Sequence, residues 1–329
     1  MASLCIIVTM RCTASCAHCA SESGPDRQEE TEEAAAMRAI EAAARAGYTD
    51  VSFNGGEPTL RLAVLKRLVT HATRLGLQTG MISNGHWATT EDQAVDLLGA
   101  LKTLGLGRLC LSTDVWHASH VPLDNVIRAA RVARAIQLSC HLSVCVDVTR
   151  PSRPSCDLLD RLARDAPVPI RTVPVAPVGR AVSLLSRAVY RRVVAGAQCV
   201  AGREVFLFPT GGLFACCFSG FWSRSGAGAL LLGNARDEDE NHLASALRRG
   251  ALSRSLRREG GPPAVLAALG ERRDLIDASV RAANAGCRRW DCWDCMELIG
   301  KIEALRGRSA PPLPQPHLTQ RLAQSPHTR

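Results

Sequence analysis

From residue 4 to about residue 174, short runs rich in β-branched residues alternate with amphipathic runs of helical period. The runs predict strands at 4–10, 50–53, 77–82, 108–111, 141–147 and 169–173. They predict helices at 29–46, 61–75, 91–104, 124–136 and 156–164. Strands that alternate with helices form a parallel sheet with right-handed crossovers. The pattern therefore predicts an α/β fold, a partial (β/α)6 barrel whose active groups collect at the carboxyl ends of the strands.

Three cysteines, Cys12, Cys16 and Cys19, directly follow the first predicted strand. Thiolates at this spacing can ligate three irons of a [4Fe-4S] cube and leave the fourth iron without a protein ligand. Structural zinc is the alternative, but zinc sites usually have four ligands, built from paired Cys-x2-Cys units or mixed with histidine. His18 is the one nearby candidate for a fourth ligand, and it lies between two of the cysteines. The spacing favours an iron-sulfur cluster.

Short polar residues and glycines follow the next three predicted strands: Gly55, Gly56 and Glu57, then Ser83 and Asn84, then Ser112 and Asp114. Paired glycines let a backbone approach a ligand closely, and a neighbouring carboxylate can accept hydrogen bonds from an ammonium group. Serine, asparagine and aspartate at strand ends could bind carboxylate and hydroxyl groups, although the same residues also make simple turns. The pattern predicts one binding site at the carboxyl edge of the sheet.

Beyond residue 183 the alternation of strands and helices stops and further cysteines appear. Four of them could hold a fully ligated auxiliary [4Fe-4S] cluster, with a zinc ribbon as the alternative: Cys199, Cys216, Cys292 and Cys295. Residues 205–217 read as a β-hairpin with a glycine turn. Adjacent side chains of a strand point to opposite faces, so if Cys216 is a ligand, Cys217 is free to face the barrel. Buried packing is the alternative role of Cys217.

The chain has 329 residues, enough for one large core and a smaller domain. We expect a barrel over 1–182, an auxiliary-cluster domain over 183–305, and a proline-rich disordered tail over 306–329. The 14 cysteines accompany no secretory signal pattern, so they are predicted to be reduced and the protein cytoplasmic. No apolar run approaches the roughly 18 residues that span a bilayer, so no membrane partner is predicted.

The net charge is +9, from 40 Lys and Arg against 31 Asp and Glu, which by itself could indicate an acidic partner. Only three of these cations are lysines, and the arginines are dispersed along predicted helices, where they form solvated faces. The sequence contains neither a helix-turn-helix nor a basic motif interleaved with aromatic residues. Nucleic acid is therefore not a favoured partner.

The Cys-x3-Cys-x2-Cys segment and the later Gly55-Gly56-Glu57-Pro58 resemble the signature of the radical S-adenosylmethionine (SAM) enzymes. In that family the open iron chelates SAM, and one electron cleaves SAM to methionine and a 5′-deoxyadenosyl radical. The resemblance implies two cofactors, [4Fe-4S] and SAM, and an electron donor such as flavodoxin or ferredoxin. It also implies that the SAM-binding residues are His18, Gly55, Gly56, Glu57, Ser83, Asn84, Ser112 and Asp114. The later cysteines resemble a twitch domain, a shortened SPASM extension.

Short matches in the same order also resemble the epipeptide epimerases, at 12–19, 83–87, 114–117, 214–217, 256–260 and 292–295. This resemblance implies L-to-D epimerisation of residues in a small ribosomally made precursor peptide. It makes Cys217 the donor that returns a hydrogen atom to the Cα radical. These enzymes carry an active-site aspartate, and Glu204 falls at its position when residues are counted back from Cys217. Counted forward from Cys199, Glu204 is one residue away from that position.

Three other functions stay open. Cross-linking of a peptide would use the same SAM chemistry on another bond. A twitch-containing dehydrogenase of a small alcohol would leave Cys217 dispensable. An iron-sulfur redox sensor, which is not an enzyme, would not cleave SAM, and fold resemblance alone does not establish activity.

Overall fold

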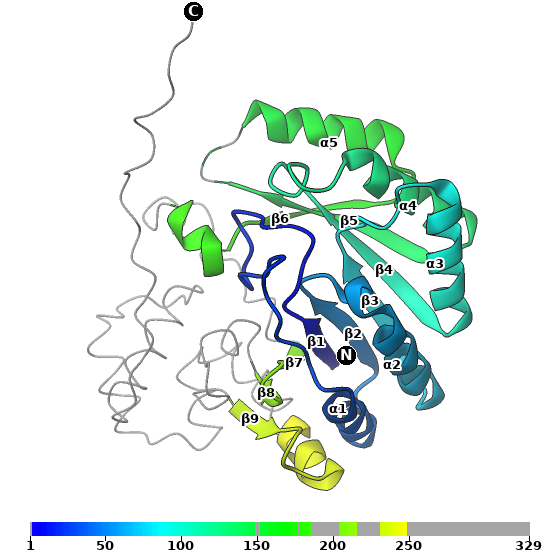
Figure 1. Cartoon of the computed structure of the whole chain (residues 1–329), viewed down its shortest axis with the longest axis vertical. Helices are drawn as coiled ribbons and strands as arrows, with labels where there is room; N and C mark the ends of the chain where they lie inside the picture. The colour runs from blue at the N-terminus through cyan, green and yellow to red at the C-terminus, as the bar shows by residue number, and fades with distance from the viewer. Residues whose placement is uncertain are drawn as a thin grey trace, which may run out of the picture.

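The computed structural model describes residues 2–148, 150, 152–176, 178–185, 204–215 and 231–248. Its strands form one nine-stranded sheet in the order β6-β5-β4-β3-β2-β1-β7-β8-β9 (Figure 1). The strands are β1 Ser3–Thr9, β2 Asp50–Gly55, β3 Gln78–Ser83, β4 Leu106–Thr113, β5 Ser139–Val146, β6 Ile170–Pro174, β7 Glu204–Leu207, β8 Gly212–Phe214 and β9 Leu231–Asn234. Neighbouring strands from β6 to β7 in this order run parallel, whereas β8 and β9 are antiparallel additions.

Five α-helices pack on one face of this sheet (Figure 1). The helices are α1 Glu33–Arg45, α2 Leu62–Arg74, α3 Glu91–Thr103, α4 Leu123–Ala135 and α5 Arg153–Asp165, with short 3-10 helices η1 Pro58–Arg61 and η2 Gly179–Ser183. Residues 240–248 are also helical. Thr90 and Ser152 cap α3 and α5 by accepting the backbone N–H three residues later. Among the described residues, no helix is both long and apolar enough to cross a membrane.

The side chains of β1 show how the strands divide the interior. Leu4, Ile6 and Val8 belong to the large core between the sheet and the helices. Cys5 and Ile7 point to the other face, where they pack with phenylalanines of β7, β8 and the turn between them. Successive residues of a strand face opposite sides, and both faces of β1 are packed with apolar side chains. Polar groups therefore lie at the ends of this strand.

The predicted fold class is confirmed, because six strands alternate with five helices between residues 3 and 174 and form a parallel sheet. The first helix was expected from residue 29 but begins at Glu33. Glu29 and Glu30 are extended instead, since Glu29 accepts the N–H of Met10 and Glu30 forms a bridge with Thr9. Cys156 is exposed on α5.

The described segments after residue 183 continue the barrel's sheet. β7 is a seventh parallel strand, paired with the free edge of β1. Val205 and Leu213 join the large core, and the Tyr48 hydroxyl donates to the Leu247 carbonyl at 3.1 Å. The domain boundary at residue 183 and the twitch domain stay predictions. The following predicted sites and segments lie outside the described residues: Cys199, Cys216, Cys217, Cys292, Cys295 and the tail 306–329.

Candidate active site at the carboxyl ends of the strands

The cysteine loop, residues 10–24, leaves the carboxyl end of β1 and closes on itself through backbone hydrogen bonds. The N–H of Cys12 donates to the Gly24 carbonyl at 3.0 Å, and the N–H of Gly24 donates to Met10 at 3.3 Å. Within the loop, the Cys19 N–H donates to the Cys16 carbonyl at 3.1 Å. Cys16 is buried, whereas Cys12 and Cys19 are half-buried. The backbone thus brings the three predicted ligands to one end of the sheet.

The Gly55-Gly56-Glu57 turn docks on the chain that enters this loop. The Gly56 N–H donates to the Thr9 carbonyl at 2.7 Å, and the Glu57 N–H donates to the Arg11 carbonyl at 2.8 Å. A Cβ atom at Gly55 or Gly56 would collide with these same two carbonyl oxygens. The sequence pattern predicted that these glycines let the backbone approach a ligand. In the structure they allow one backbone to approach another, which fixes where the cysteine loop begins.

The Glu57 carboxylate is fully buried and is held by groups of this chain. It accepts the Thr59 hydroxyl at 2.7 Å, the Ser83 hydroxyl at 3.0 Å and the Asn84 N–H at 2.9 Å. Ser83 in turn accepts the indole N–H of Trp87 at 2.8 Å. Charge-assisted hydrogen bonds of this kind are stronger than neutral ones. Glu57 therefore joins the ends of β2 and β3.

Asn84 extends this network to the cysteine loop. Its side-chain amide donates to the Thr13 hydroxyl at 3.1 Å and lies 3.7 Å from the Cys12 sulfur. Its side-chain oxygen accepts the His86 N–H at 3.0 Å, which fixes the orientation of the amide. Hydrogen bonds to cluster-ligating sulfurs tune iron-sulfur clusters, so an amide directed at the sulfur of Cys12, a predicted ligand, fits that prediction.

Asp114 follows β4, is 1% exposed, and collects donors from two histidines. It accepts the N–H groups of Trp116 and His117 at 2.9 Å each. One carboxylate oxygen lies 2.8 Å from His117 Nδ1 and 3.3 Å from His18 Nε2. Burial opposes charge on His117, but its hydrogen bonds to Asp114 and Cys16 raise its pKa to about 10. Asp114 thus orients both histidines beside the buried cysteine.

His18 has the opposite electrostatic character to His117. Burial lowers its pKa to about 4, although the Asp114 carboxylate acts against this shift. Its ring stacks on Trp116 with centroids 4.8 Å apart and planes 30° apart. Its buried Nδ1 atom has no hydrogen-bond partner among the described residues. A neutral aromatic pair with one unpaired polar atom is suited to a flat ligand that carries a hydrogen-bonding edge.

Of the remaining predicted residues, Ser112 lies at the carboxyl end of β4 and is half-buried. Glu204 lies at the other end of the sheet, because it pairs with Ser3, the first residue of β1. Ser3 and Thr9 are six residues apart, about 20 Å along a strand. Burial raises the Glu204 pKa. The structure therefore does not bring Glu204 together with the cysteine loop.

Sequence reasoning missed three residues of this site: Thr59, Trp116 and Arg180. Thr59 follows Pro58 in the turn signal, but its bond to Glu57 depends on the end of β3 being adjacent. Arg180 stands in the segment after the last predicted strand of the barrel, and its side chain contacts the cysteine loop. The adjacent Gly179, which has φ near +55°, marks a turn but does not indicate this contact.

The spacing of the three sulfurs bears on which metal centre the loop fits. A tetrahedral zinc ion with Zn–S bonds of about 2.3 Å brings its ligand sulfurs to about 3.8 Å from one another. In two groups of described residues, the candidate ligand atoms all lie within 4.8 Å of one another. One group is Cys16, His18 and His117, and the other is His18, Asp114 and Cys145. Cys12, Cys16 and Cys19 do not form such a group. At least two of their sulfurs therefore lie more than 4.8 Å apart, farther than the ligands of one tetrahedral zinc ion.

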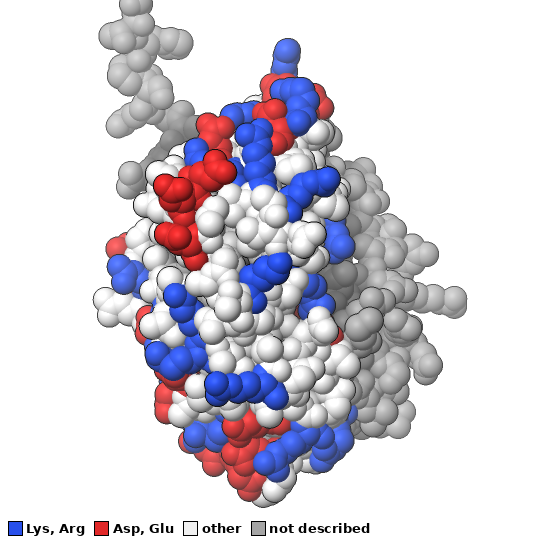
Figure 2. Space-filling view, turned by 90° about the vertical axis from the view of Figure 1, so that its right-hand side faces the viewer, with Lys and Arg blue, Asp and Glu red and all other residues white. Residues whose placement is uncertain are grey.

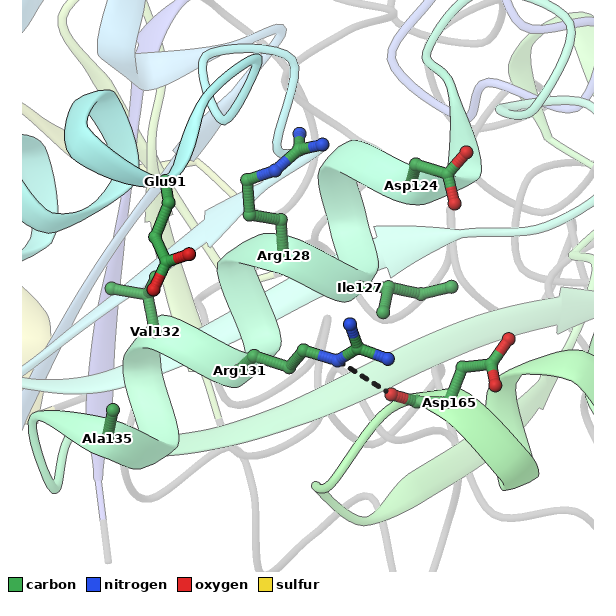
Figure 3. Close-up of a pocket in the computed structure, with 8 residues that line it drawn as sticks. All are labelled: Glu91, Asp124, Ile127, Arg128, Arg131, Val132, Ala135 and Asp165. Atoms are coloured by element: carbon green, nitrogen blue, oxygen red, sulfur yellow. Dashed lines mark hydrogen bonds between the residues drawn. The ribbon is translucent and has the colours of Figure 1, made fainter.

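A cavity of about 350 Å³ lies on the helical side of the sheet, away from this site (Figure 3). It is lined by residues of α3, α4 and the end of α5, and Arg131 Nε donates to the Asp165 carbonyl at 3.2 Å across it. None of the predicted site residues lines it. Figure 2 shows positive and negative side chains interspersed on the face that it displays, rather than one basic surface. This face carries no electrostatic signature of nucleic-acid binding.

Residues 6–149 match the sequence pattern of the family described as the Radical SAM superfamily. A curated relative, "Putative peptide biosynthesis protein YydG" of Bacillus subtilis (strain 168), is 28% identical over 141 residues. That match covers 42% of this chain and 44% of the relative, less than half of each.

Two solved structures share similarity over most of the chain. The structure of tagged anSMEcpe with bound AdoMet covers 94% of this chain and 98% of its own, with a TM-score of 0.51 and 14% identity. The match to BtrN in complex with AdoMet and 2-DOIA covers 80% of this chain and 89% of the BtrN chain, with a TM-score of 0.46 and 13% identity. The first likeness supports the fold. The family implies a [4Fe-4S] cluster and SAM, which the cysteine loop and its neighbours fit. The auxiliary cluster stays a prediction.

Proposed function

We propose that this chain is a radical SAM enzyme that converts L-residues of a ribosomally made peptide to D-residues. The observation that carries the proposal is the cysteine loop, fixed by buried hydrogen bonds at the carboxyl ends of the strands of a radical SAM domain. A peptide substrate is supported by the relative that is described as a peptide biosynthesis protein. Epimerisation is supported by the ordered short matches to the epipeptide epimerases.

In this proposal the described residues bind and orient the cofactors. Cys12, Cys16 and Cys19 hold the [4Fe-4S] cluster, whose electron, with bound SAM, supplies the radical that removes a Cα hydrogen atom. Asn84 holds Cys12 and its neighbour Thr13 in place. The stacked pair of His18 and Trp116 offers a flat surface for the adenine of SAM.

Cys217 then returns a hydrogen atom to the peptide. Its S–H bond breaks as the new Cα–H bond forms on the opposite face, which inverts the centre. The sulfur is left as a thiyl radical, and one electron and one proton from an external reductant restore the thiol. Cys217 lies outside the described residues, and Glu204, at the amino ends of the strands, has no part in this proposal.

Mass spectrometry of an anaerobic reaction in deuterated water tests the proposal. The reaction contains SAM, a reductant and a candidate precursor peptide. We expect one deuterium per modified residue with the wild type, and none with Cys217→Ala, which still forms 5′-deoxyadenosine. Cys156→Ala is the matched control, because Cys156 is exposed on α5 and its loss leaves deuterium incorporation unchanged.

Two results would contradict the proposal in different ways. A product two mass units lighter than the peptide, formed equally by Cys217→Ala, would indicate oxidation or cross-linking by the same radical chemistry. Absence of 5′-deoxyadenosine from the reconstituted wild type would contradict enzymatic SAM cleavage altogether, and would favour an iron-sulfur redox sensor.

A further inference from the structure

The cysteine loop meets the opposite edge of the parallel sheet. The loop leaves β1, and η2 follows β6, which lies five strands away from β1 in the sheet order. Figure 1 shows the loop, in dark blue, beside the green helical turn of η2. A contact between these two segments therefore connects the two sides of the partial barrel across the ends of its strands.

Arg180 makes this contact through three hydrogen bonds to carbonyl groups of the loop. Its Nε donates to Cys16 at 2.9 Å, its Nη2 donates to Ser23 at 2.8 Å, and its backbone N–H donates to Cys19 at 3.1 Å. The planar guanidinium directs its donors in fixed directions, which a lysine ammonium does not do. One side chain thus binds the loop at Cys16 and again seven residues later.

Gly179 provides independent evidence that the approach is close. Its backbone has φ near +55°, in the left-handed region that favours glycine. A Cβ atom at this position would collide with the carbonyl oxygens of Cys19 and Ala20. The backbone of η2 therefore packs directly on the backbone of the cysteine loop, and any larger residue would separate them.

The hydrogen bonds of Arg180 go to carbonyl groups rather than to a carboxylate. Among the described residues, no acidic side chain forms an ion pair with Arg180. Hydrogen bonds from a charged donor are stronger than those from a neutral donor. The loop lacks helix and strand structure of its own, so these bonds add to the backbone hydrogen bonds that close it.

We propose that Arg180 is a positioning residue that fixes the cysteine loop in the shape needed to hold the cluster and to leave one iron open for SAM. The side chain acts on the backbone of Cys16 and Ser23 and does not touch the reacting atoms. This inference rests on cluster binding by the cysteine loop, and it is independent of peptide epimerisation.

Electron paramagnetic resonance of the reduced, reconstituted protein tests Arg180, with and without SAM. Only a cluster with an open iron changes its spectrum when SAM binds, so an auxiliary cluster does not obscure the readout. In Arg180→Met we expect the SAM-dependent change in the spectrum to be largely lost. We also expect iron to pass to a chelator about tenfold faster than in the wild type, because a charged hydrogen bond is lost. Arg131→Met is the matched control, because Arg131 donates to one carbonyl on the helical side.

Arg180→Lys separates positioning from simple loss of folding. It keeps the positive charge but cannot span both carbonyl groups, so we expect a folded protein with iron release between those of wild type and Arg180→Met. Wild-type iron release and a wild-type response to SAM in both variants would overturn the proposal. A wild type that responds to SAM but leaves the peptide unchanged would instead contradict the proposed epimerisation and leave the role of Arg180 standing.

Discussion

The two ends of the parallel strands use their charged residues differently. At the carboxyl ends, Glu57 and Asp114 are almost completely buried, and each accepts several hydrogen bonds from neighbouring strand ends and turns. At the amino ends, Asp50 forms an ion pair with Arg108, whose side chain is 47% exposed, and Glu204 is paired through its backbone with Ser3. The same sheet thus carries a connected polar network at one end and separate polar groups at the other.

This difference between the two ends predicts which substitutions will affect neighbouring residues. Burial of a carboxylate is costly unless several donors converge on it, so the buried groups at the carboxyl ends depend on one another. An ion pair with one solvent-exposed partner, as Asp50 has in Arg108, contributes less than a set of buried donors that converge on one carboxylate. We therefore expect substitutions at the carboxyl ends to disturb both stability and cluster binding, and substitutions at the amino ends to do neither strongly.

The largest effect on stability is expected for Gly56→Ala. The new methyl group would collide with the carbonyl oxygen of Arg11, and neither backbone can move without displacing the start of the cysteine loop. We expect a loss of about 3 kcal/mol or more in chemical denaturation, together with poor cluster retention. Gly99→Ala is the matched control, because a Cβ there meets nothing within 4 Å. In helix α3 it should stabilise the protein by up to about 1 kcal/mol.

Glu57→Gln is expected to have the next largest effect. The Glu57 oxygens accept from Thr59 and Asn84, and an amide would turn one acceptor into a donor that faces another donor. We expect a loss of about 2–4 kcal/mol in the free energy of unfolding. Glu33→Gln, which weakens an ion pair with the half-exposed Arg67, should cost less than about 1 kcal/mol. Equal losses in the two variants would contradict the contrast between a buried carboxylate that several donors hold and an exposed ion pair.

Glu204→Gln should have the smallest effect, with a dependence on pH that reveals its cause. Burial raises the Glu204 pKa above its ordinary value of 4.5, so the folded protein holds this proton more tightly than the unfolded chain. Stability is therefore lost as pH rises through the interval above 4.5. The variant should melt higher than the wild type at about pH 8, by at most about 4 °C, and equally at about pH 4. SAM cleavage should be retained, whereas its loss would indicate that Glu204 belongs to the active site.

Much of the fold could be predicted because it depends on local patterns. Alternating runs indicated the six strands, and glycine, serine and asparagine after the strands marked the edge that carries the site. The partners of these residues could not be predicted, since they depend on which strand ends are adjacent. The Glu57 bonds to Ser83 and Asn84, residues of the next strand end, are an example.

Two further contacts could not be predicted from the sequence for the same reason. Arg180 reaches Cys16 across 164 positions of the chain, and no pattern near either residue indicates that contact. The hairpin of β7 and β8 was predicted, but the parallel pairing of β7 with β1 was not, because β1 is distant from β7 in the sequence.

Reductive cleavage of SAM by the reconstituted protein tests the central claim most directly. The assay measures 5′-deoxyadenosine for the wild type, for a variant with Cys12, Cys16 and Cys19 changed to alanine, and for Cys110→Ala. We predict that the wild type and Cys110→Ala form 5′-deoxyadenosine and that the triple variant forms none. Formation of 5′-deoxyadenosine by the triple variant, or its absence from the wild type, would contradict a SAM-cleaving cluster in the cysteine loop.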